Sequence, residues 1–361
     1  MRIAVITNAY PPESRGGAGV IAADLVELWR AQGHEVRVWS RYAAWLRSHA
    51  LRRLVGHLWD DRVGGVDLVR DVVAWNPDVV VTHNLTGLGW TIGRRLQVAG
   101  TAWIHILHDV QLFEPSGTVY STNITWWQRW WGWYRRSMFG VPDRLIAPTQ
   151  WLLDQHAVRG FGARVPCVVI PNPLPDVGVH PPIEPVETQW MYVGNMSDQK
   201  GLPLINQLAK ARPTEAFTCI GDGPWRHTLG MLPNVRCVGQ VPRELVLREL
   251  VQARAVLAPS RLIENQPTVI LEAFALGVPV IASASGGIPE TVGAGGQVVA
   301  LEQDAWMRAL DKVNQAPETW RARAVEQRTR FDRASISVQW GKVLLQMLSE
   351  KKTHTPTPDR P

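Results

Sequence analysis

Short apolar runs alternate with amphipathic segments along the first half of the chain. The apolar runs cover residues 2–8, 35–40, 79–83, 102–108, 144–149 and 167–171. Runs of this length bounded by polar or turn-forming residues are typical of buried strands. The clearest helical periodicity covers residues 19–32, where Ile21, Leu25, Leu28 and Trp29 share one face. Strands that alternate with helices predict a parallel, doubly wound sheet.

The same pattern restarts after a proline-rich interruption. Residues 173–188 hold five prolines and show no helical or strand period, which predicts a linker. Apolar runs then cover 190–194, 217–221, 235–239, 255–258, 278–282 and 297–300, and residues 303–315 and 333–350 have helical patterns. We therefore expect an α/β protein with a domain at 1–173, a linker at 174–187, a second domain at 188–332, a terminal helix at 333–350 and a flexible tail at 351–361.

This arrangement predicts where a ligand binds. In open parallel sheets, ligands bind at the carboxyl ends of the strands, so we expect the site in a cleft between the two domains. A length of 361 residues is sufficient for two such cores.

Cysteine usage and hydropathy indicate the compartment. Cys167, Cys219 and Cys237 lie in apolar, strand-like runs without metal-ligand spacing, so we interpret them as reduced core thiols of a cytoplasmic protein. Neither a signal peptide nor an apolar stretch of about 18 residues is visible in the sequence, so we expect no membrane span.

Two carboxylates near the end of the second half are the most informative feature. Glu264 and Glu272 have seven residues between them. The run at 255–258 predicts a strand, residues 260–266 a polar loop, and Pro267 the first residue of a helix that continues through 269–275. A helix N-terminus between two carboxylates can bind a phosphate. The alternative for either glutamate alone is a cap or a solvated helix residue.

Other loops follow predicted strands with polar or glycine-rich sequences. Residues 8–19 contain Gly16 and Gly17 before the first helix, without the spacing of dinucleotide-binding motifs. His83-Asn84 and His108-Asp109 each end a strand, whereas His105 lies inside one and is expected to be a hydrogen-bonded core residue. In the second half the loops are 194–201, which ends in Lys200-Gly201, 221–224 and 238–242. Simple turn chemistry explains any one of them alone.

Taken together, some 30 residues from Pro259 through Glu290 resemble the signature of the group 1 retaining glycosyltransferases, which include glycogen synthases, sucrose synthases and envelope mannosyltransferases. The resemblance implies the GT-B fold, with two Rossmann-like domains facing a central cleft. It also implies that Glu272 holds the ribose of a nucleotide-sugar, that Glu264 lies near the donor sugar, and that the loop between them wraps the diphosphate.

The resemblance assigns further roles. It implies His108, Lys200 and Glu264 as catalytic residues, His83, Asn84 and Asp109 as acceptor-side residues, and a donor site made of Gly16, Gly17, Asn195, Gly221, Val241, Asn265, Pro267, Thr268, Val269 and Glu272. It implies no cofactor and no metal, with the donor in UDP or GDP form and front-face displacement with retention. Asn195 departs from the pattern, because relatives often carry an arginine there. Binding of the diphosphate and stabilisation of the leaving group would then depend on Lys200 and helix dipoles, with Arg261 as a candidate substitute for the missing arginine.

An aromatic and basic run bears on the acceptor. Residues 125–136 hold five tryptophans with Arg129, Arg135 and Arg136, and residues 41–53 carry Arg41, Arg47, Arg52 and Arg53 without an acid. Tryptophan with arginine favours anionic bilayer interfaces, which predicts peripheral contact with the inner face of the membrane and a glycan or lipid-linked acceptor. The alternative is that these tryptophans fill the core or stack on sugars. Nucleic acid is disfavoured, because no binding fold accompanies the charge.

We therefore expect a hexosyltransferase of polysaccharide or glycolipid biosynthesis. Two alternatives stay open: a non-hydrolysing sugar-nucleotide epimerase, which shares the fold but lacks this glutamate pair, and a non-catalytic sugar-binding relative, which Asn195 makes conceivable.

Overall fold

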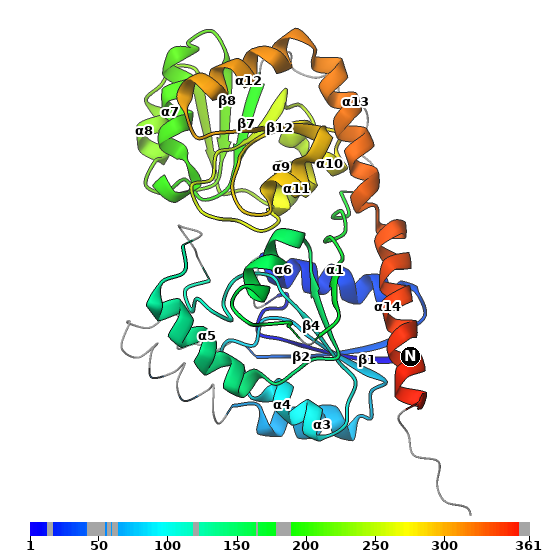
Figure 1. Ribbon diagram of the computed structural model, residues 1–361. Coiled ribbons are helices and arrows are strands. Elements are labelled where there is room, and N and C mark those ends of the chain that lie inside the picture. The colour runs from blue at the N-terminus through cyan, green and yellow to red at the C-terminus, as the bar shows by residue number, and fades with distance from the viewer. Residues whose placement is uncertain are drawn as a thin grey trace, which may run out of the picture. The chain divides into compact units, whose positions relative to one another are not determined.

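A computed structural model describes residues 1–12, 17–41, 55, 59, 64–117, 123–163, 165–177 and 189–353. The chain divides into two units (Figure 1). The first unit contains the described residues up to Asn172 together with those from Arg333 onward, and the second runs from Pro173 to Asp332.

The first unit is built on a parallel six-stranded sheet of order β2-β1-β3-β4-β5-β6. Successive strands are therefore added on one side of β1 up to β2 and on its other side from β3 onward. The boundary between β1 and β3 is a topological switch point. Its strands are β1 (Arg2–Thr7), β2 (Glu35–Ser40), β3 (Val79–Thr82), β4 (Trp103–Ile106), β5 (Arg144–Ala147) and β6 (Cys167–Val169). Its described helices are α1 (Gly17–Ala31), α3 (Val66–Ala74), α4 (Ile92–Val98), α5 (Trp126–Phe139), α6 (Gln150–Ala157) and α14 (Arg333–Thr353).

The second unit has its own parallel sheet, of order β12-β11-β10-β7-β8-β9, with the switch point between β7 and β10. Its strands are β7 (Gln189–Val193), β8 (Ala216–Ile220), β9 (Val235–Gly239), β10 (Ala255–Ala258), β11 (Val280–Ser283) and β12 (Gly296–Val299). Its helices are α7 (Leu202–Ala211), α8 (Arg226–Gly230), α9 (Arg243–Leu250), α10 (Thr268–Ala275), α11 (Ile288–Val292), α12 (Gln303–Gln315) and α13 (Pro317–Arg328), with 3₁₀ turns η2 (Asp198–Lys200), η3 (Gly293–Gly295) and η4 (Thr329–Phe331).

The last helix completes the core of the first unit. Helix α14 lies beside α1 (Figure 1), and both contribute to one cluster of buried side chains over β1 and β3. Trp340 of α14 meets Trp29 of α1 edge to face, with ring centroids 5.1 Å apart. Because both indoles are fully buried, the terminal helix contributes substantially to the stability of this unit.

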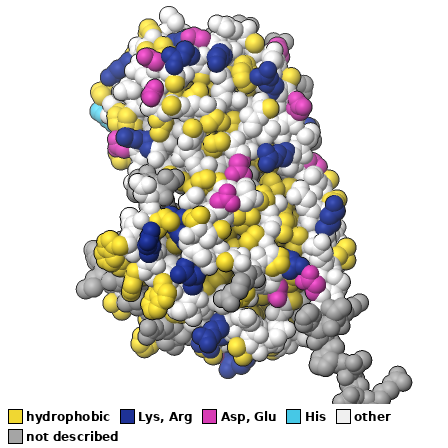
Figure 2. Space-filling view, in the orientation of Figure 1, with side chains coloured by type: hydrophobic (Ala, Val, Ile, Leu, Met, Phe, Trp, Pro, Cys, Tyr) yellow, Lys and Arg dark blue, Asp and Glu magenta, His cyan; other side chains and the backbone are white. Residues whose placement is uncertain are grey.

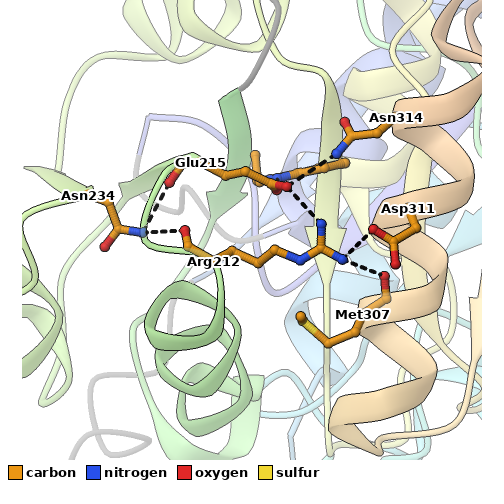
Figure 3. Close-up of polar contacts among 7 residues, drawn as sticks. Arg212, Glu215, Asn234, Met307, Asp311 and Asn314 are labelled. Carbon is orange, nitrogen blue, oxygen red and sulfur yellow. Dashed lines mark hydrogen bonds and ion pairs between the residues drawn. The ribbon is translucent and has the colours of Figure 1, made fainter.

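A polar cluster fixes α12 against α7 in the second unit (Figure 3). Arg212, which ends α7, pairs with Glu215 at 2.8 Å and with Asp311 of α12, and it donates to the Met307 carbonyl. Asn234 donates to the carbonyls of Arg212 and Glu215. The turn before β8 is thus held on both sides.

The α/β fold with two doubly wound parallel sheets is confirmed, and each of the twelve predicted strands is present within one or two residues at either end. Two details differ. Pro267 is the N-cap of α10 in an extended conformation, so the helix begins one residue later than predicted. Helix α13 was not predicted, since Ala324 is its one fully buried residue and no apolar stripe marks it.

Candidate active site

Lys200 and Glu264 occupy the switch point of the second sheet. Lys200 ends the turn after β7, and Glu264 lies in the loop after β10, so their loops leave the two strands between which the sheet order reverses. Lys200 Nζ lies 2.9 Å from Glu264 Oε2, and the two side chains are about a third and a fifth exposed. The structure therefore brings together two residues that the sequence placed separately in the site.

Gly201 explains why glycine follows this lysine. Its φ of +81° is in the left-handed region, and a Cβ at this position would lie 1.8 Å from the Pro259 carbonyl oxygen. The backbone of Gly201 therefore packs directly on the end of β10, and this contact places Lys200 beside the Glu264 loop.

The Glu264 backbone is held by the turn after β11. The Gly287 amide donates to the Glu264 carbonyl at 2.8 Å, and a Cβ on Gly286 (φ +59°) would lie 2.0 Å from the same oxygen. The hydroxyls of Ser283 and Ser285 donate to the carbonyls of Ser260 and Leu262 at 2.7 and 2.9 Å. The loop is thus immobilised by a second loop, which orients the Glu264 side chain.

Residues 265–267 lead into α10, which begins with Thr268 and Val269. Asn265, Pro267, Thr268 and Val269 are half-buried, and the N-cap Pro267 gives the first turn of the helix no side-chain capping hydrogen bond. Amides in an uncapped first turn are suited to bind an anion. This part of the predicted donor site is therefore formed by backbone as much as by side chains.

Glu272 lies one turn into α10 and pairs with Arg243. Arg243 Nε is 3.3 Å from Glu272 Oε1, and the glutamate side chain is 16 % exposed. Burial raises the pKa of Glu272, and the charge and hydrogen bond of Arg243 oppose that rise. Sequence reasoning missed Arg243, although it directly follows the 238–242 loop that was singled out.

Asn195 exposes its side chain, while its carbonyl accepts a hydrogen bond from Tyr192 Oη at 2.7 Å. Burial and the nearby charge of Glu264 raise the pKa of Tyr192. Arg261 is exposed, and its amide donates to the Gln199 carbonyl at 2.9 Å, so its backbone adjoins the Lys200 turn. An arginine is thus present next to this turn, supplied by a different loop from the one that contains Asn195.

Gly221 lies in a stack of turns at the ends of neighbouring strands. A Cβ on Gly221 (φ +133°) would lie 2.0 Å from the Gly194 carbonyl oxygen. The Gly221 amide donates to the Gly239 carbonyl at 2.9 Å. Val241, just beyond, packs on the core below α10 and is half-buried. The turns after β7, β8 and β9 are therefore in contact through backbone.

Two histidines meet at the carboxyl ends of β3 and β4 in the first unit. His83 Nδ1 lies 2.7 Å from His108 Nε2 with the rings nearly parallel, while His83 Nε2 is buried and makes no hydrogen bond to any described residue. Burial lowers the pKa of His83 well below its usual value and that of His108 to about 4. Both imidazoles are therefore neutral near neutral pH, and one ring donates to the other.

Asn84 and Asp109 continue this cluster. Asn84 Nδ2 donates to Asp109 Oδ2 at 3.3 Å and to Gln111 Oε1 at 2.6 Å. Burial raises the pKa of Asp109 to about 6, although the Gln111 amide and the Asn84 side chain oppose the rise. The acceptor-side candidates His83, Asn84 and Asp109 thus lie together with His108, and Gln111 is an unpredicted member.

The glycine-rich loop of the first unit is described in part. Gly17 is the first residue of α1 and is exposed, whereas Gly16 lies outside the described residues. His105 is buried and its Nδ1 lies 2.7 Å from Thr82 Oγ1, as expected of a core histidine. Of the basic stretch 41–53, Arg41 is described and exposed, while Arg47, Arg52 and Arg53 lie outside the described residues.

The three cysteines differ in their exposure. Cys219 is buried and Cys237 half-buried, but Cys167 is exposed because it lies on the edge strand β6, so the expectation that all three are core thiols is wrong for Cys167. Among the described residues, no group of three or more His, Cys, Asp or Glu side chains could hold a metal ion. None of the described helices is both long and apolar enough to cross a bilayer.

Known proteins resemble the chain in sequence and in fold. The family Glycosyltransferase Family 4 matches residues 15–176, and the family Glycosyl transferases group 1 matches residues 187–315. A putative teichuronic acid biosynthesis glycosyltransferase, TuaC of Bacillus subtilis, is 35 % identical over 104 residues, which are 28 % of this chain and 26 % of TuaC. The chain thus spans about a quarter of that relative's length.

Solved structures share the fold over the whole chain. Sucrose-phosphate synthase from Thermosynechococcus elongatus has a TM-score of 0.73 at 20 % identity, covering 97 % of this chain and 100 % of its own. Anabaena HepE, solved in complex with UDP-glucose, has a TM-score of 0.69 at 17 % identity, covering 96 % and 100 %. The fold is that of GT-B enzymes, and the two halves of the chain contain a Glycosyltransferase Family 4 domain and a Glycosyl transferases group 1 domain.

Proposed function

We propose that this protein is a retaining hexosyltransferase that moves a sugar from a nucleoside-diphosphate sugar to a saccharide or lipid-linked saccharide, in polysaccharide or glycolipid biosynthesis. The observation that carries the proposal is the Lys200–Glu264 pair at the switch point of the second sheet, whose glutamate lies in the loop that leads to α10. The likeness to TuaC, named for teichuronic acid biosynthesis, supports a polysaccharide product. The likeness to HepE, solved with UDP-glucose, supports a UDP-sugar donor, and a GDP-sugar is the alternative donor.

The donor site assigns different tasks to the two glutamates. Glu272 would accept hydrogen bonds from the ribose hydroxyls, and its pairing with Arg243 opposes the rise in pKa that burial causes. Glu264 would orient the donor sugar and hold Lys200 in position. The backbone stack of Gly194, Gly221 and Gly239, with Val241 beyond it, would contact the base.

The reaction needs negative charge to be stabilised on the departing diphosphate. The bond from the anomeric carbon to the phosphate oxygen breaks, the acceptor oxygen bonds to the same face of that carbon, and the acceptor proton passes to the departing phosphate. Lys200, the first-turn amides of α10 and Arg261 are the groups that we assign to the diphosphate. The sequence has no Asp-x-Asp motif, so the proposal includes metal independence.

We assign the His83–His108 cluster to sugar recognition. Both imidazoles are neutral near neutral pH and supply no positive charge, so the half-buried His108, positioned by the buried His83, can exchange hydrogen bonds with hydroxyl groups. Asn84 and Asp109 add amide and carboxylate groups to the same surface. Such a mixture of donors and acceptors suits the hydroxyls of an acceptor or donor sugar.

The test is incubation of the purified protein with labelled UDP-, GDP- and ADP-sugars and a lipid extract or oligosaccharide. Transfer with the donor's anomeric configuration preserved in the product, observed by NMR, supports the proposal. Interconversion of the donors without transfer would instead identify an epimerase. Nucleotide-sugar binding without turnover of any donor would identify a non-catalytic relative.

A further inference from the structure

Helix α5 exposes an unusual number of tryptophans. Trp126, Trp127, Trp130 and Trp133 are all exposed, with Trp126 and Trp133 at 77 and 61 %. The opposite face is anchored, because Trp131, Tyr134 and Met138 form a buried cluster. We call the four exposed residues the tryptophan face. In the region of α5 in Figure 1, Figure 2 shows hydrophobic side chains beside Lys or Arg side chains.

The tryptophan face is ordered by its own stacking. Trp127 and Trp130 stack with centroids 5.0 Å apart, and Trp130 stacks on the buried Tyr134 at 5.8 Å with an interplanar angle of 3°. The capping box of Thr125 and Gln128 fixes the start of the helix. The indoles therefore form a preorganised apolar surface that faces solvent.

An arginine-lined pocket adjoins this face. Arg129 and Arg136 lie along one edge of the exposed stripe and, with Arg159, line an open pocket of about 530 Å³. Its other lining residues are Ile124, Gln128, Val158 and Gly160, so no carboxylate of the described residues lines it. A carboxylate touches the pocket only through Gln128, whose side-chain amide donates to Glu114 Oε2 at 3.2 Å among the described contacts.

Arg159 is the residue that points to a ligand. It is 6 % exposed, and its Nε and Nη2 are buried without a hydrogen-bond partner among the described residues, although Nη1 donates to Gln155. Its guanidinium lies 4.0 Å over the Phe113 ring. A buried guanidinium with unmet donors in a pocket with two further arginines favours an anion with several oxygens, such as a phosphate.

We propose that the tryptophan face and the arginine pocket together bind an anionic phospholipid bilayer, with a lipid phosphate in the pocket of Arg129, Arg136 and Arg159. Indoles partition to the interface between headgroups and acyl chains, and arginines beside them attract anionic headgroups. A neutral oligosaccharide could stack on the indoles but would leave the arginine donors without an anionic partner. The proposal deepens the proposed function by naming the surface where a lipid-linked acceptor is met, and its test does not require transfer.

The experiment is flotation of the full chain with vesicles of phosphatidylcholine alone or mixed with phosphatidylglycerol. We expect binding to the mixed vesicles and little to phosphatidylcholine. Arg129→Gln/Arg136→Gln should lower the partition coefficient about 30-fold, since each basic residue near an anionic surface contributes about fivefold. The control Arg70→Gln/Arg308→Gln removes two exposed arginines elsewhere and should bind like the wild type.

Two further variants separate the parts of the site. Trp126→Ala/Trp133→Ala should lower binding by about tenfold or more, whereas Val98→Ser, at another exposed apolar residue, should not. Arg159→Lys keeps the charge but loses the planar fork, and should lower binding about fivefold at an unchanged melting temperature. Arg129 and Arg136 are exposed, so their variants remain informative if the Arg159 variant is unstable.

Several outcomes would overturn the proposal. These are equal flotation of the wild type and Arg129→Gln/Arg136→Gln, equal binding to both vesicle types, or no vesicle binding by folded protein. Binding of inorganic phosphate or a soluble glycan without vesicle binding would also overturn it. UDP and GDP binding, which we assign to the second unit, is measured on the same samples, so loss of donor binding with intact flotation would count against the proposed function alone.

Discussion

Lys200 Nζ and Glu264 Oε2 lie 2.9 Å apart, although 63 residues separate them along the chain. Their loops follow β7 and β10, the two strands that flank the switch point of the second sheet. Both side chains are partly exposed, so the pair contributes at most about 1 kcal/mol to folding. We therefore expect its main effect in the reaction rather than in stability.

Removing the lysine charge should lower turnover far more than stability. For Lys200→Met we expect kcat to fall about 100-fold or more, because a charge directed at the leaving group is lost, while the melting temperature changes little. Glu264→Gln keeps the shape of the side chain and should cost less. The two single variants and the double variant form a cycle, and strictly additive losses would show that the pair does not act as a unit.

Glu272 and Arg243 should govern donor affinity. We expect Glu272→Ala to weaken binding of UDP or GDP by about 10- to 100-fold, since a carboxylate that accepts two hydroxyl groups is removed. Arg243→Ala should weaken it less and should raise the pKa of Glu272 further, because the opposing charge is lost. Calorimetry with the free nucleotide measures both. Unchanged nucleotide affinity in Glu272→Ala would show that the ribose assignment is wrong.

The histidine pair should make stability fall in acid. The folded state depresses the pKa of His108 to about 4, so the unfolded chain binds a proton more readily between about pH 6.5 and 4. Above pH 6.5 His108 is neutral in both states and costs the folded state nothing. As the pH falls through this window, protonation of the unfolded chain lowers the free energy of unfolding. His108→Asn should therefore flatten the profile of unfolding free energy against pH by about 1 kcal/mol or more.

Asp109 changes stability with pH in the opposite direction to His108, and it therefore provides the control. Its folded pKa of about 6 exceeds its usual value, so the ionised carboxylate destabilises the folded state above pH 6, and this cost disappears as pH falls towards 4. Asp109→Asn should then stabilise the protein at pH 7.5 and steepen the loss in acid. Urea unfolding at several pH values distinguishes the two variants, and parallel profiles would contradict both assignments.

The strands could be predicted from sequence because buried parallel strands appear as short apolar runs, as at residues 79–83 and 255–258. The loops that bear the candidate site followed from the same runs, since polar residues at strand ends mark the ligand edge of a sheet. The pairing of Arg243 with Glu272 did not follow, because it depends on how α9 and α10 pack. No local period in the sequence encodes that packing.

Helix α5 shows a second limit of prediction from sequence, which concerns the face of a helix that is buried. In a helix over residues 125–136, Trp126, Trp130 and Trp133 share one face, which is exposed, and Trp127, Trp131 and Tyr134 share another. In the structure that second group is divided, because Trp127 is exposed while Trp131 and Tyr134 are buried. Apolar side chains on both faces leave the buried side undefined until the neighbouring elements are known.

Gly201→Ala tests how tightly the fold controls the position of Lys200. Gly201 and Gly33 have nearly the same backbone conformation, with φ of +81° and +82°, but a Cβ on Gly33 meets no atom within 4 Å. Gly33→Ala should therefore cost only the left-handed backbone, about 1 kcal/mol. Gly201→Ala should cost about 3 kcal/mol or more, because its Cβ would lie 1.8 Å from the Pro259 carbonyl and the loop must move.

That movement should also disturb the reaction. Because the displaced backbone carries Lys200, we expect Gly201→Ala to lower kcat at temperatures where the variant is still folded, whereas Gly33→Ala should leave kcat unchanged. Chemical unfolding gives the stability difference, and turnover with the best donor gives the second readout. If both variants lost the same stability and neither lost activity, the contact between Gly201 and the end of β10 would not be what positions the lysine.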